Sequence, residues 1–439
     1  MATVAHSLFS WQAVESSDDI FRFQRLLEGL DDGRLIEHLV ADRKGRRDDN
    51  PIGAMWNSLL AGLVFGHAGV ASLRRELRRN AELRQVCGFD PFKGSKAVPS
   101  ADAYSRFIKK VADHVDLVME VFENLVTRVG ELLGDFGRRL AADGKAIRAC
   151  RRDDADAAVG KKKQGHPDGE GAVEVTYEWF GYKLHMLCDA PYELPIAFEV
   201  TNAAVHESPK LLDLVEHAAD RHETLLERSE TLCADMGFDD GADKATLYDE
   251  HGIAPIIPAR DLKGGRYEPL NPDRHDTIYV SSTGQVCCKM RPFAATDEQR
   301  YVPMQYTGFE SDRRTLKFRC PAAAYGVTCE NRQACRCAPQ VRDGDWGRVV
   351  RVPIETNRRL FGPVYAHSYR FEDEYKSRTS VERLFFRFDH LYGFEHHTTR
   401  GLARMKVRVA MALVAMLATA VGWIEAGQPE NARRMLQAA

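Results

Sequence analysis

Apolar and polar positions alternate at a helical period between Glu374 and Gly393, in the stretch EYKSRTSVERLFFRFDHLYG. The apolar members fall on one stripe and are Val381, Leu384, Phe385 and Phe388. A stripe of this width is typical of a helix packed on a core with its polar face at the rim. The pattern therefore predicts an amphipathic helix that begins at Tyr375.

Three polar side chains share another face of this expected helix. Tyr375, Arg378 and Glu382 follow an i, i+3, i+7 spacing, which places them within about 60° of one another around the helix axis. A solvated helix with an Arg378–Glu382 pair, worth about 0.2–0.5 kcal/mol, is a sufficient explanation by itself. The rest of the chain decides whether the glutamate has a further role.

The first 130 residues read as a helical region. From Asn50 onward, apolar helix-like runs alternate with Arg-rich turns, and the sequence Pro-Ser-Ala-Asp at 99–102 is a start signal for a helix over 104–129. Several short basic helices can dock on duplex DNA, but there is no helix-turn-helix signature. Both a DNA-binding region and a plain helical scaffold remain open for residues 1–130.

A different rhythm begins at Arg138. Residues 138–147, 181–190 and 193–203 read as three strands, followed by a helix at 208–221, a strand at 231–240, a helix at 241–252 and a strand at 252–260. This order predicts a mixed sheet with helices on its faces, an α/β fold. Residues 153–174 are rich in charge and Gly, and we expect a mobile loop there.

The remainder divides into three further parts. Residues 261–371 are turn-rich with short strand-like pieces and six cysteines, and they read as an insertion into the sheet domain of residues 138–260. Residues 372–426 would supply closing helices and residues 427–439 a tail. The uncharged run from Val409 to Ile424 is shorter than the ~20 residues of a spanning helix, which favours a buried core helix over a membrane segment.

Composition is that of an ordinary soluble protein, with 44% hydrophobic and 28% charged residues among 439. The formal net charge of -3 argues against a uniformly basic nucleic-acid coat, although basic clusters occur locally. The first residues lack a secretory signal, so we expect a cytoplasmic protein whose ten cysteines are reduced.

Three acids stand at informative places in this scheme. Asp143 lies on the first strand, Asp235 ends the fourth and Glu382 lies on the closing helix. Either aspartate alone is explained as a turn former. An acid at all three places is a much rarer arrangement.

The residues around these acids resemble a known family. DGKAI from Asp143, CADMGFDD around Asp235 and the Tyr-x2-Arg-x3-Glu spacing that ends at Glu382 resemble the DDE transposases of bacterial insertion sequences. The likeness extends from about Pro51 to Ile424. It implies an RNase H-like catalytic domain, an all-helical N-terminal region and a Cys-containing insertion before the last catalytic helix.

The resemblance also implies a chemistry for the acids. Cleavage of a phosphodiester by two divalent ions, Mg2+ or Mn2+, uses carboxylate oxygens as metal ligands. By this resemblance Asp143 would bind both ions, and Asp235 and Glu382 would each bind one. Arg378 would contact a phosphate near the cut and Tyr375 would pack along the same backbone. The implied activity is cutting the ends of a mobile element and joining them to target DNA.

One position departs from the family pattern. The signature usually ends in a lysine seven residues after the glutamate, and here that residue is Asp389. Arg387 or Lys406 could supply the missing charge, and together with Arg400 we expect them to contact DNA. The departure also supports an alternative, a catalytically inactive, transposase-derived DNA-binding protein. A nuclease that cuts without joining is a related alternative.

The partners follow from the same resemblance. They are double-stranded DNA, both terminal inverted repeats and target, and a second copy of the chain in a synaptic complex. The resemblance implies no membrane, and it implies a bacterial cytoplasmic location, at the nucleoid when DNA is bound.

The cysteines of the insertion are candidates for a structural zinc site. Six candidates compete for four tetrahedral places, and the adjacent Cys287 and Cys288 can hardly both serve. The zinc candidates are therefore Cys288, Cys320, Cys329, Cys335 and Cys337. No paired CxxC is present, so zinc ligands and unligated thiols both remain open.

Overall fold

The structure of the protein is a computed structural model that describes residues 18–43, 50–164, 175–272, 277–290, 300–326, 329, 335 and 347–433. The chain divides into two compact units. Unit 1 comprises residues 1–137, 143–225 and 380–439, and unit 2 comprises residues 138–142 and 226–379. The boundary crosses strand β1 (Arg139–Arg148), whose first residues belong to unit 2 and whose later residues belong to unit 1.

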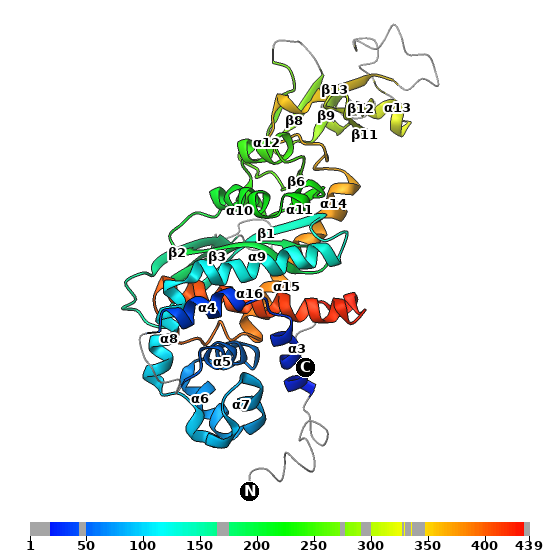
Figure 1. Cartoon of the computed structure of the whole chain (residues 1–439). Coiled ribbons are helices and arrows are strands. Elements are labelled where there is room, and N and C mark those ends of the chain that lie inside the picture. Colours follow the sequence, from blue (N-terminus) through cyan, green and yellow to red (C-terminus); the bar gives the residue numbers. More distant parts are fainter. Residues whose placement is uncertain are drawn as a thin grey trace. The chain divides into compact units, whose positions relative to one another are not determined.

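The N-terminal part of unit 1 is helical (Figure 1). Its helices are α3 (Asp18–Glu28), α4 (Gly33–Ala41), α5 (Ile52–Val64), α6 (Val70–Arg79), α7 (Ala81–Cys87), α8 (Ala101–Asp113) and α9 (Val115–Leu132). The predicted start signal is confirmed, because Ser100 caps α8 by accepting a hydrogen bond from Ala103 N at 3.1 Å. The expected single helix over 104–129 is interrupted at His114, which separates α8 from α9.

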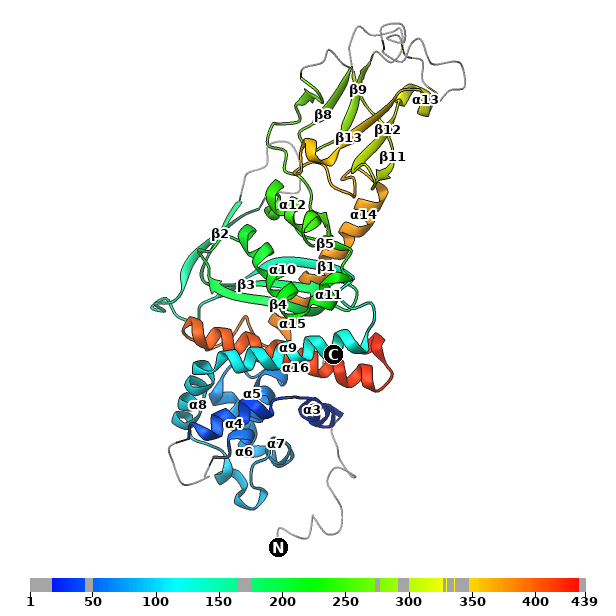
Figure 2. The ribbon, with the colours of Figure 1, turned by 45° about the horizontal axis from the view of Figure 1, so that its top comes forward.

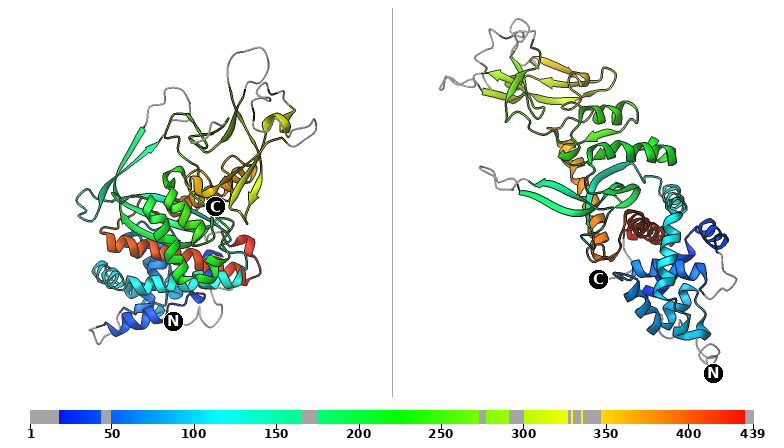
Figure 3. Two further views of the ribbon diagram at one scale, coloured as in Figure 1. Left: turned by 90° about the horizontal axis from the view of Figure 1, so that it is seen from above. Right: turned by 90° about the vertical axis from the view of Figure 1, so that its left-hand side faces the viewer.

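The long helix α16 (Leu402–Glu425) lies beside α9 in unit 1 (Figures 1 and 3). It is the one helix, within the part of the chain that the structure describes, that is long and apolar enough to cross a membrane. Yet 78% of its apolar window is buried inside the protein. The prediction of a buried core helix is therefore confirmed, and a helix of this kind is weak evidence for a membrane segment.

Unit 1 also holds one side of the mixed sheet. Strand β3 (Val175–Asp189) pairs antiparallel with β2 (Ala158–Gln164) along its first half and with β4 (Leu194–Asn202) along its second half. Helix α10 (Ser208–Arg221) packs against β3 and β4. The expected loop over 153–174 is wrong for its first half, since backbone pairing with β3 makes Ala158–Gln164 a strand despite three consecutive lysines. Residues 165–174 lie outside the described residues.

Unit 2 continues the sheet with parallel strands. β1 pairs with β5 (Thr231–Cys233), and β5 pairs with β6 (Ala254–Ile256). Helices α12 (Gly241–Asp249) and α14 (Tyr369–Tyr375) pack beside these strands, and the short helix α11 (Glu223–Glu227) precedes them. Cys233, Ile256 and Phe371 form part of a small buried core here.

The rest of unit 2 is built from two small antiparallel sheets (Figure 2). One contains β7 (Tyr267–Pro269), β8 (Ile278–Ser281), β9 (Val286–Met290) and β10 (Arg300–Pro303). The other contains β11 (Gln305–Glu310), β12 (Thr315–Arg319) and β13 (Val349–Pro353), with the short helix α13 (Pro321–Tyr325) after β12. A shared core that includes Leu316, Phe318 and Tyr365 joins them.

The helix predicted from Tyr375 is not continuous. Tyr375 ends α14, residues Lys376–Arg378 form a 3-10 turn, and α15 covers Thr379–His390. Ser377 Oγ donates to Glu374 O at 2.5 Å and Thr379 Oγ1 donates to Lys376 O at 3.0 Å, so hydroxyl groups compete for the helix carbonyls. The prediction of one regular helix with Tyr375, Arg378 and Glu382 on one face was therefore wrong, and the unit boundary falls between Arg378 and Glu382.

The fold class predicted from the sequence is confirmed. The mixed sheet has six strands in the order β2-β3-β1-β5-β6, and β4 also pairs with β3. The pairing of β3 with β2 and β4 is antiparallel, and β1, β5 and β6 are parallel. Helices precede it, and the small sheets are inserted before α15. The fold is an RNase H-like α/β sheet with a helical N-terminal region and a Cys-containing insertion.

Candidate active site

Asp143 is a buried acid in the middle of β1. It follows the buried residues Leu140, Ala141 and Ala142, and is itself only 7% exposed. Its Oδ1 accepts a hydrogen bond from Gly144 N at 2.7 Å. Burial in a strand restricts this carboxylate to few orientations.

Asp235 comes directly after the buried strand β5. Its carboxylate accepts a hydrogen bond from Gly237 N at 2.6 Å and so caps the short turn Met236–Phe238. A Cβ atom at position 237 would lie 2.5 Å from Asp235 Oδ1, which explains why a glycine stands there. The turn therefore fixes where the acid points.

The strand register relates the two aspartates. β1 and β5 are adjacent and parallel, and Ala141 is the partner of Cys233, as Leu140 is of Leu232. Asp143 lies two residues after Ala141, and Asp235 lies two residues after Cys233. Side chains two residues apart on a strand point to the same face. Asp143 and Asp235 therefore each lie two residues beyond a paired residue, on two adjacent parallel strands.

A buried ion network holds the turn that follows Asp235. The carboxylate of Asp239 is fully buried, and it accepts hydrogen bonds from Lys244 Nζ at 2.6 Å and Arg359 Nε at 2.8 Å. Arg260 N also donates to Asp239, while Arg260 Nε donates to Met236 O at 2.7 Å. Burial lowers the pKa of Lys244, against the effect of Asp239. These contacts tie the turn to residues far along the chain.

Glu382 lies in the first turn of α15, on its exposed side. The opposite side is apolar and buried, with Val381, Leu384 and Phe388 fully covered. The amphipathic helix predicted for this part of the chain is confirmed. Because its apolar side is packed, the helix presents Glu382 in a fixed direction.

One contact in unit 1 connects the strand of Asp143 with the helix of Glu382. Lys145 Nζ lies 2.5 Å from Asp389 Oδ2, and the same ammonium lies 5.8 Å from the centroid of the Phe385 ring. Lys145 was not among the site residues predicted from the sequence. Its spacing of two from Asp143 could have indicated it, because that spacing places both side chains on one face of a strand.

The family model described as Transposase DDE domain matches residues 134–418, which include both aspartates and Glu382. The chain belongs to the DDE transposase family. Among solved structures, a piggyBac transposase synaptic complex with hairpin DNA is similar, with 10% sequence identity and a TM-score of 0.40 over 96% of this chain and 77% of that chain. No curated protein matches the sequence.

Tyr375 and Arg378 of this transposase lie together in unit 2. The Arg378 guanidinium carbon is 5.8 Å from the centroid of the Tyr375 ring, and that ring stacks on Phe371 with centroids 6.1 Å apart. Tyr375 is half-buried and packs on the core of β5 and β6. The Arg378 guanidinium therefore lies close to the Tyr375 ring.

Arg387 of the transposase has a different environment from the one expected of a DNA contact. It is only 8% exposed, and its NH2 group donates to Glu193 O at 2.7 Å and lies 3.2 Å from Glu193 Oε2. Its NH1 group donates to Arg433 O at 2.9 Å. Burial lowers its pKa, and these partners make Arg387 a structural residue. We therefore do not retain it as a DNA ligand.

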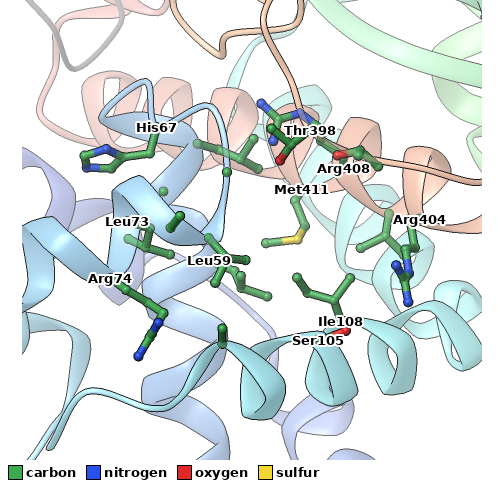
Figure 4. A pocket seen from close by; sticks show the side chains of 18 of the residues that line it. Leu59, His67, Leu73, Arg74, Ser105, Ile108, Thr398, Arg404, Arg408 and Met411 are labelled. Atoms are coloured by element: carbon green, nitrogen blue, oxygen red, sulfur yellow. The ribbon is translucent and has the colours of Figure 1, made fainter. Parts of the chain in front are cut away.

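Arg400 and Lys406 lie near the start of α16, where Arg400 is exposed and Lys406 is half-buried. The Arg400 NH2 group donates to Asp153 O at 2.9 Å. Arg400 also lines a pocket of about 420 Å³ between helices of unit 1 (Figure 4). Leu59, Ile108 and Met411 contribute to its apolar wall, and its charged lining residues are basic: Arg74, Arg400, Arg404 and Arg408.

Several cysteines of the transposase insertion lie near one another in the described part of the chain. Burial raises the pKa of the Cys288 thiol to about 11, and the nearby thiols of Cys320, Cys329 and Cys335 act in the same direction. In the described ranges, there is no group of three or more His, Cys, Asp or Glu side chains that could hold a metal ion. Cys337 lies outside the described residues. Zinc binding in the insertion stays a prediction.

Proposed function

We propose that this DDE transposase cuts the ends of a mobile element and joins them to target DNA, with Asp143, Asp235 and Glu382 as the ligands of two divalent metal ions. The observation that carries the proposal is the register of β1 and β5. It places two aspartates equally far beyond the paired residues Ala141 and Cys233 of adjacent parallel strands, inside the matched family domain.

The residues fit a hard divalent cation. Mg2+ and Mn2+ prefer carboxylate oxygens, and all three proposed ligands carry them. Backbone N–H groups of Gly144 and Gly237 donate to carboxylate oxygens of Asp143 and Asp235, respectively, which helps to orient these two proposed ligands. When bound, two such ions supply activation of the attacking oxygen and stabilisation of the leaving oxygen.

The protein groups have separable roles in this proposal. The buried strand holds Asp143, and the network of Asp239, Lys244 and Arg359 keeps the turn of Asp235 in place. Arg378 binds a phosphate of the DNA backbone, oriented by Tyr375, because a guanidinium fits phosphate oxygens with two N–H groups. Arg400 and Lys406 add phosphate contacts outside the metal site.

The partners are proposed on the same grounds. Double-stranded DNA is the substrate, both as terminal repeats and as target. A homodimer would hold two ends together, as cutting and joining both ends requires. A bacterial insertion sequence as the source and a location at the nucleoid follow from the sequence resemblance.

The experiment is a cleavage and strand-transfer assay on DNA that carries the inverted repeats flanking this gene. Asp143→Asn, Asp235→Asn and Glu382→Gln should each abolish Mg2+-dependent nicking and joining while leaving DNA binding intact. Glu372→Gln is the matched control, since Glu372 is an exposed acid on the neighbouring helix α14. A variant of the three that cuts at the normal rate would remove its residue from the site.

A second function is favoured by one observation, the acid at position 389. A DNA-binding protein without catalysis would bind the terminal repeats, and the unmodified protein would neither nick nor join them in Mg2+ or Mn2+. A nuclease would nick without joining. The same assay separates all three activities.

A further inference from the structure

The Lys145–Asp389 ion pair joins two surfaces that carry proposed metal ligands. Asp143 and Lys145 are two residues apart on β1 and so project from the same face of the strand. Glu382 and Asp389 are seven residues apart on α15, two helical turns, and so lie on the same side of the helix. All four residues belong to unit 1. The pair therefore links the face of β1 that carries Asp143 with the side of α15 that carries Glu382.

Both members of the pair are largely withdrawn from water. The Lys145 side chain is 12% exposed and the Asp389 side chain is 20% exposed. Removing two charges from water costs free energy that their attraction often fails to recover, so a pair of this kind is weak evidence for stability. A role in binding gives a better reason for keeping a lysine at this place.

The charge of the site gives that role a physical basis. Three carboxylates repel the phosphates of DNA unless cations lie among them. The Lys145 ammonium has three N–H donors, of which Asp389 accepts one, and it stands over the negative face of the Phe385 ring. A lysine is a compact charge that binds phosphate well.

We propose that Lys145 binds a phosphate of the cut DNA strand beside Asp143, and that Asp389 positions its ammonium group. This inference rests on the proposed function. In this arrangement the lysine lies on strand β1 and the acid lies on helix α15. An acid at position 389 is therefore compatible with an active transposase. Lys145 is the ligand in this arrangement, and Asp389 is a positioning residue.

The test uses the full chain and two readouts. Lys145→Met keeps the length of the side chain beside Phe385 and removes its charge. It should slow Mg2+-dependent nicking at least ten-fold. Without divalent metal, it should reduce the slope of log affinity against log salt by about 0.9, the value for one phosphate on duplex DNA. Lys145→Arg should restore the slope, and Asp389→Asn should slow nicking while leaving the slope unchanged.

Lys263→Met is the control. Lys263 also makes an ion pair at 2.5 Å, with Glu268 in unit 2, but both side chains are exposed. It should change neither readout. Thermal melting of each variant confirms folding, and a purely structural lysine would lower the melting temperature in Lys145→Met with rate and slope unchanged, which would overturn the inference.

The two proposals fail in different ways. If the unmodified protein binds the repeats but never cuts them, the proposed function fails, and the salt slope still decides whether Lys145 binds phosphate. If the unmodified protein cuts the repeats and Lys145→Met has the same nicking rate and the same salt slope, only the inference about Lys145 fails.

Discussion

Arg359 donates its Nε–H to the buried carboxylate of Asp239 at 2.8 Å, four residues after the proposed metal ligand Asp235. The two residues are 120 apart in the chain, so this contact is a product of the tertiary fold. It makes the turn after β5 depend on a segment that follows the inserted sheets.

Arg359→Met should destabilise unit 2 by about 3 kcal/mol, because it removes one partner from a fully buried carboxylate. It should also weaken Mn2+ binding, since the turn that carries Asp235 loses a support. Urea unfolding and isothermal titration with Mn2+ measure the two effects. Arg313→Met, at an exposed arginine of unit 2, is the control and should change neither. Normal stability in Arg359→Met would show that the network does not hold the turn.

Gly181→Ala should destabilise unit 1 by on the order of 3 kcal/mol. A Cβ atom at Gly181 on β3 would lie 2.1 Å from Ile147 O and 2.6 Å from Ala149 N, so the two backbones would have to separate. Gly53→Ala provides the comparison, because an added Cβ there meets nothing within 4 Å, and in helix α5 it should add about 0.5–1 kcal/mol. Equal urea midpoints for the two variants would argue against close packing of β1 and β3.

The group of His217, His222 and Glu123 should make stability depend on pH. Hydrogen bonding to Glu123 raises the pKa of His217 above its ordinary 6.5, although burial opposes this. Burial would raise the pKa of Glu123, but hydrogen bonds from His217 and His222 lower it below 4.5 overall.

The directions of these two pKa shifts define the pH range in which the group stabilises the protein. The raised pKa of His217 gives stability that is complete below pH 6.5 and is lost as pH rises through its folded pKa. The lowered pKa of Glu123 gives stability that is present above pH 4.5 and is lost as pH falls. The free energy of unfolding of Glu123→Gln should therefore fall furthest below that of the unmodified protein between about pH 4.5 and 6.5. A difference that is constant from pH 4 to 9 would contradict the assignment.

Arg400→Met should weaken DNA binding uniformly across sequences and reduce the salt slope by about 0.9. Arg400 is exposed at the edge of a pocket whose charged lining residues are arginines, and its contact with Asp153 is a surface contact. Filter binding or fluorescence anisotropy between 50 and 300 mM salt measures the slope. An unchanged slope would remove Arg400 from the DNA surface.

Hydrophobic pattern was sufficient to predict much of this fold. The strands around Asp143 and Asp235 and the helix α16 are strongly apolar, and burial of such segments can be predicted from their sequence alone. β2 was missed because Lys161, Lys162 and Lys163 carry no apolar period, and pairing with β3 is a tertiary effect that the local sequence does not contain.

The candidate site was also predicted only in part from the sequence. The three acids were predicted from local motifs, while their supports were not. Asp239 and Arg359 are distant in sequence, as are Lys145 and Asp389, and only the fold brings each pair together. Arg387 was predicted to contact DNA because a basic residue beside a polar helix face is usually exposed. In the structure it is buried and pairs with Glu193.

Binding of Mn2+ by the unmodified chain is the most informative measurement, because it examines the proposed metal ligands without requiring cleavage. The unmodified protein should bind Mn2+, and Asp143→Asn and Asp235→Asn should each weaken this binding at least ten-fold, while Glu372→Gln should not. Identical Mn2+ titrations for the unmodified protein and both aspartate variants would contradict it.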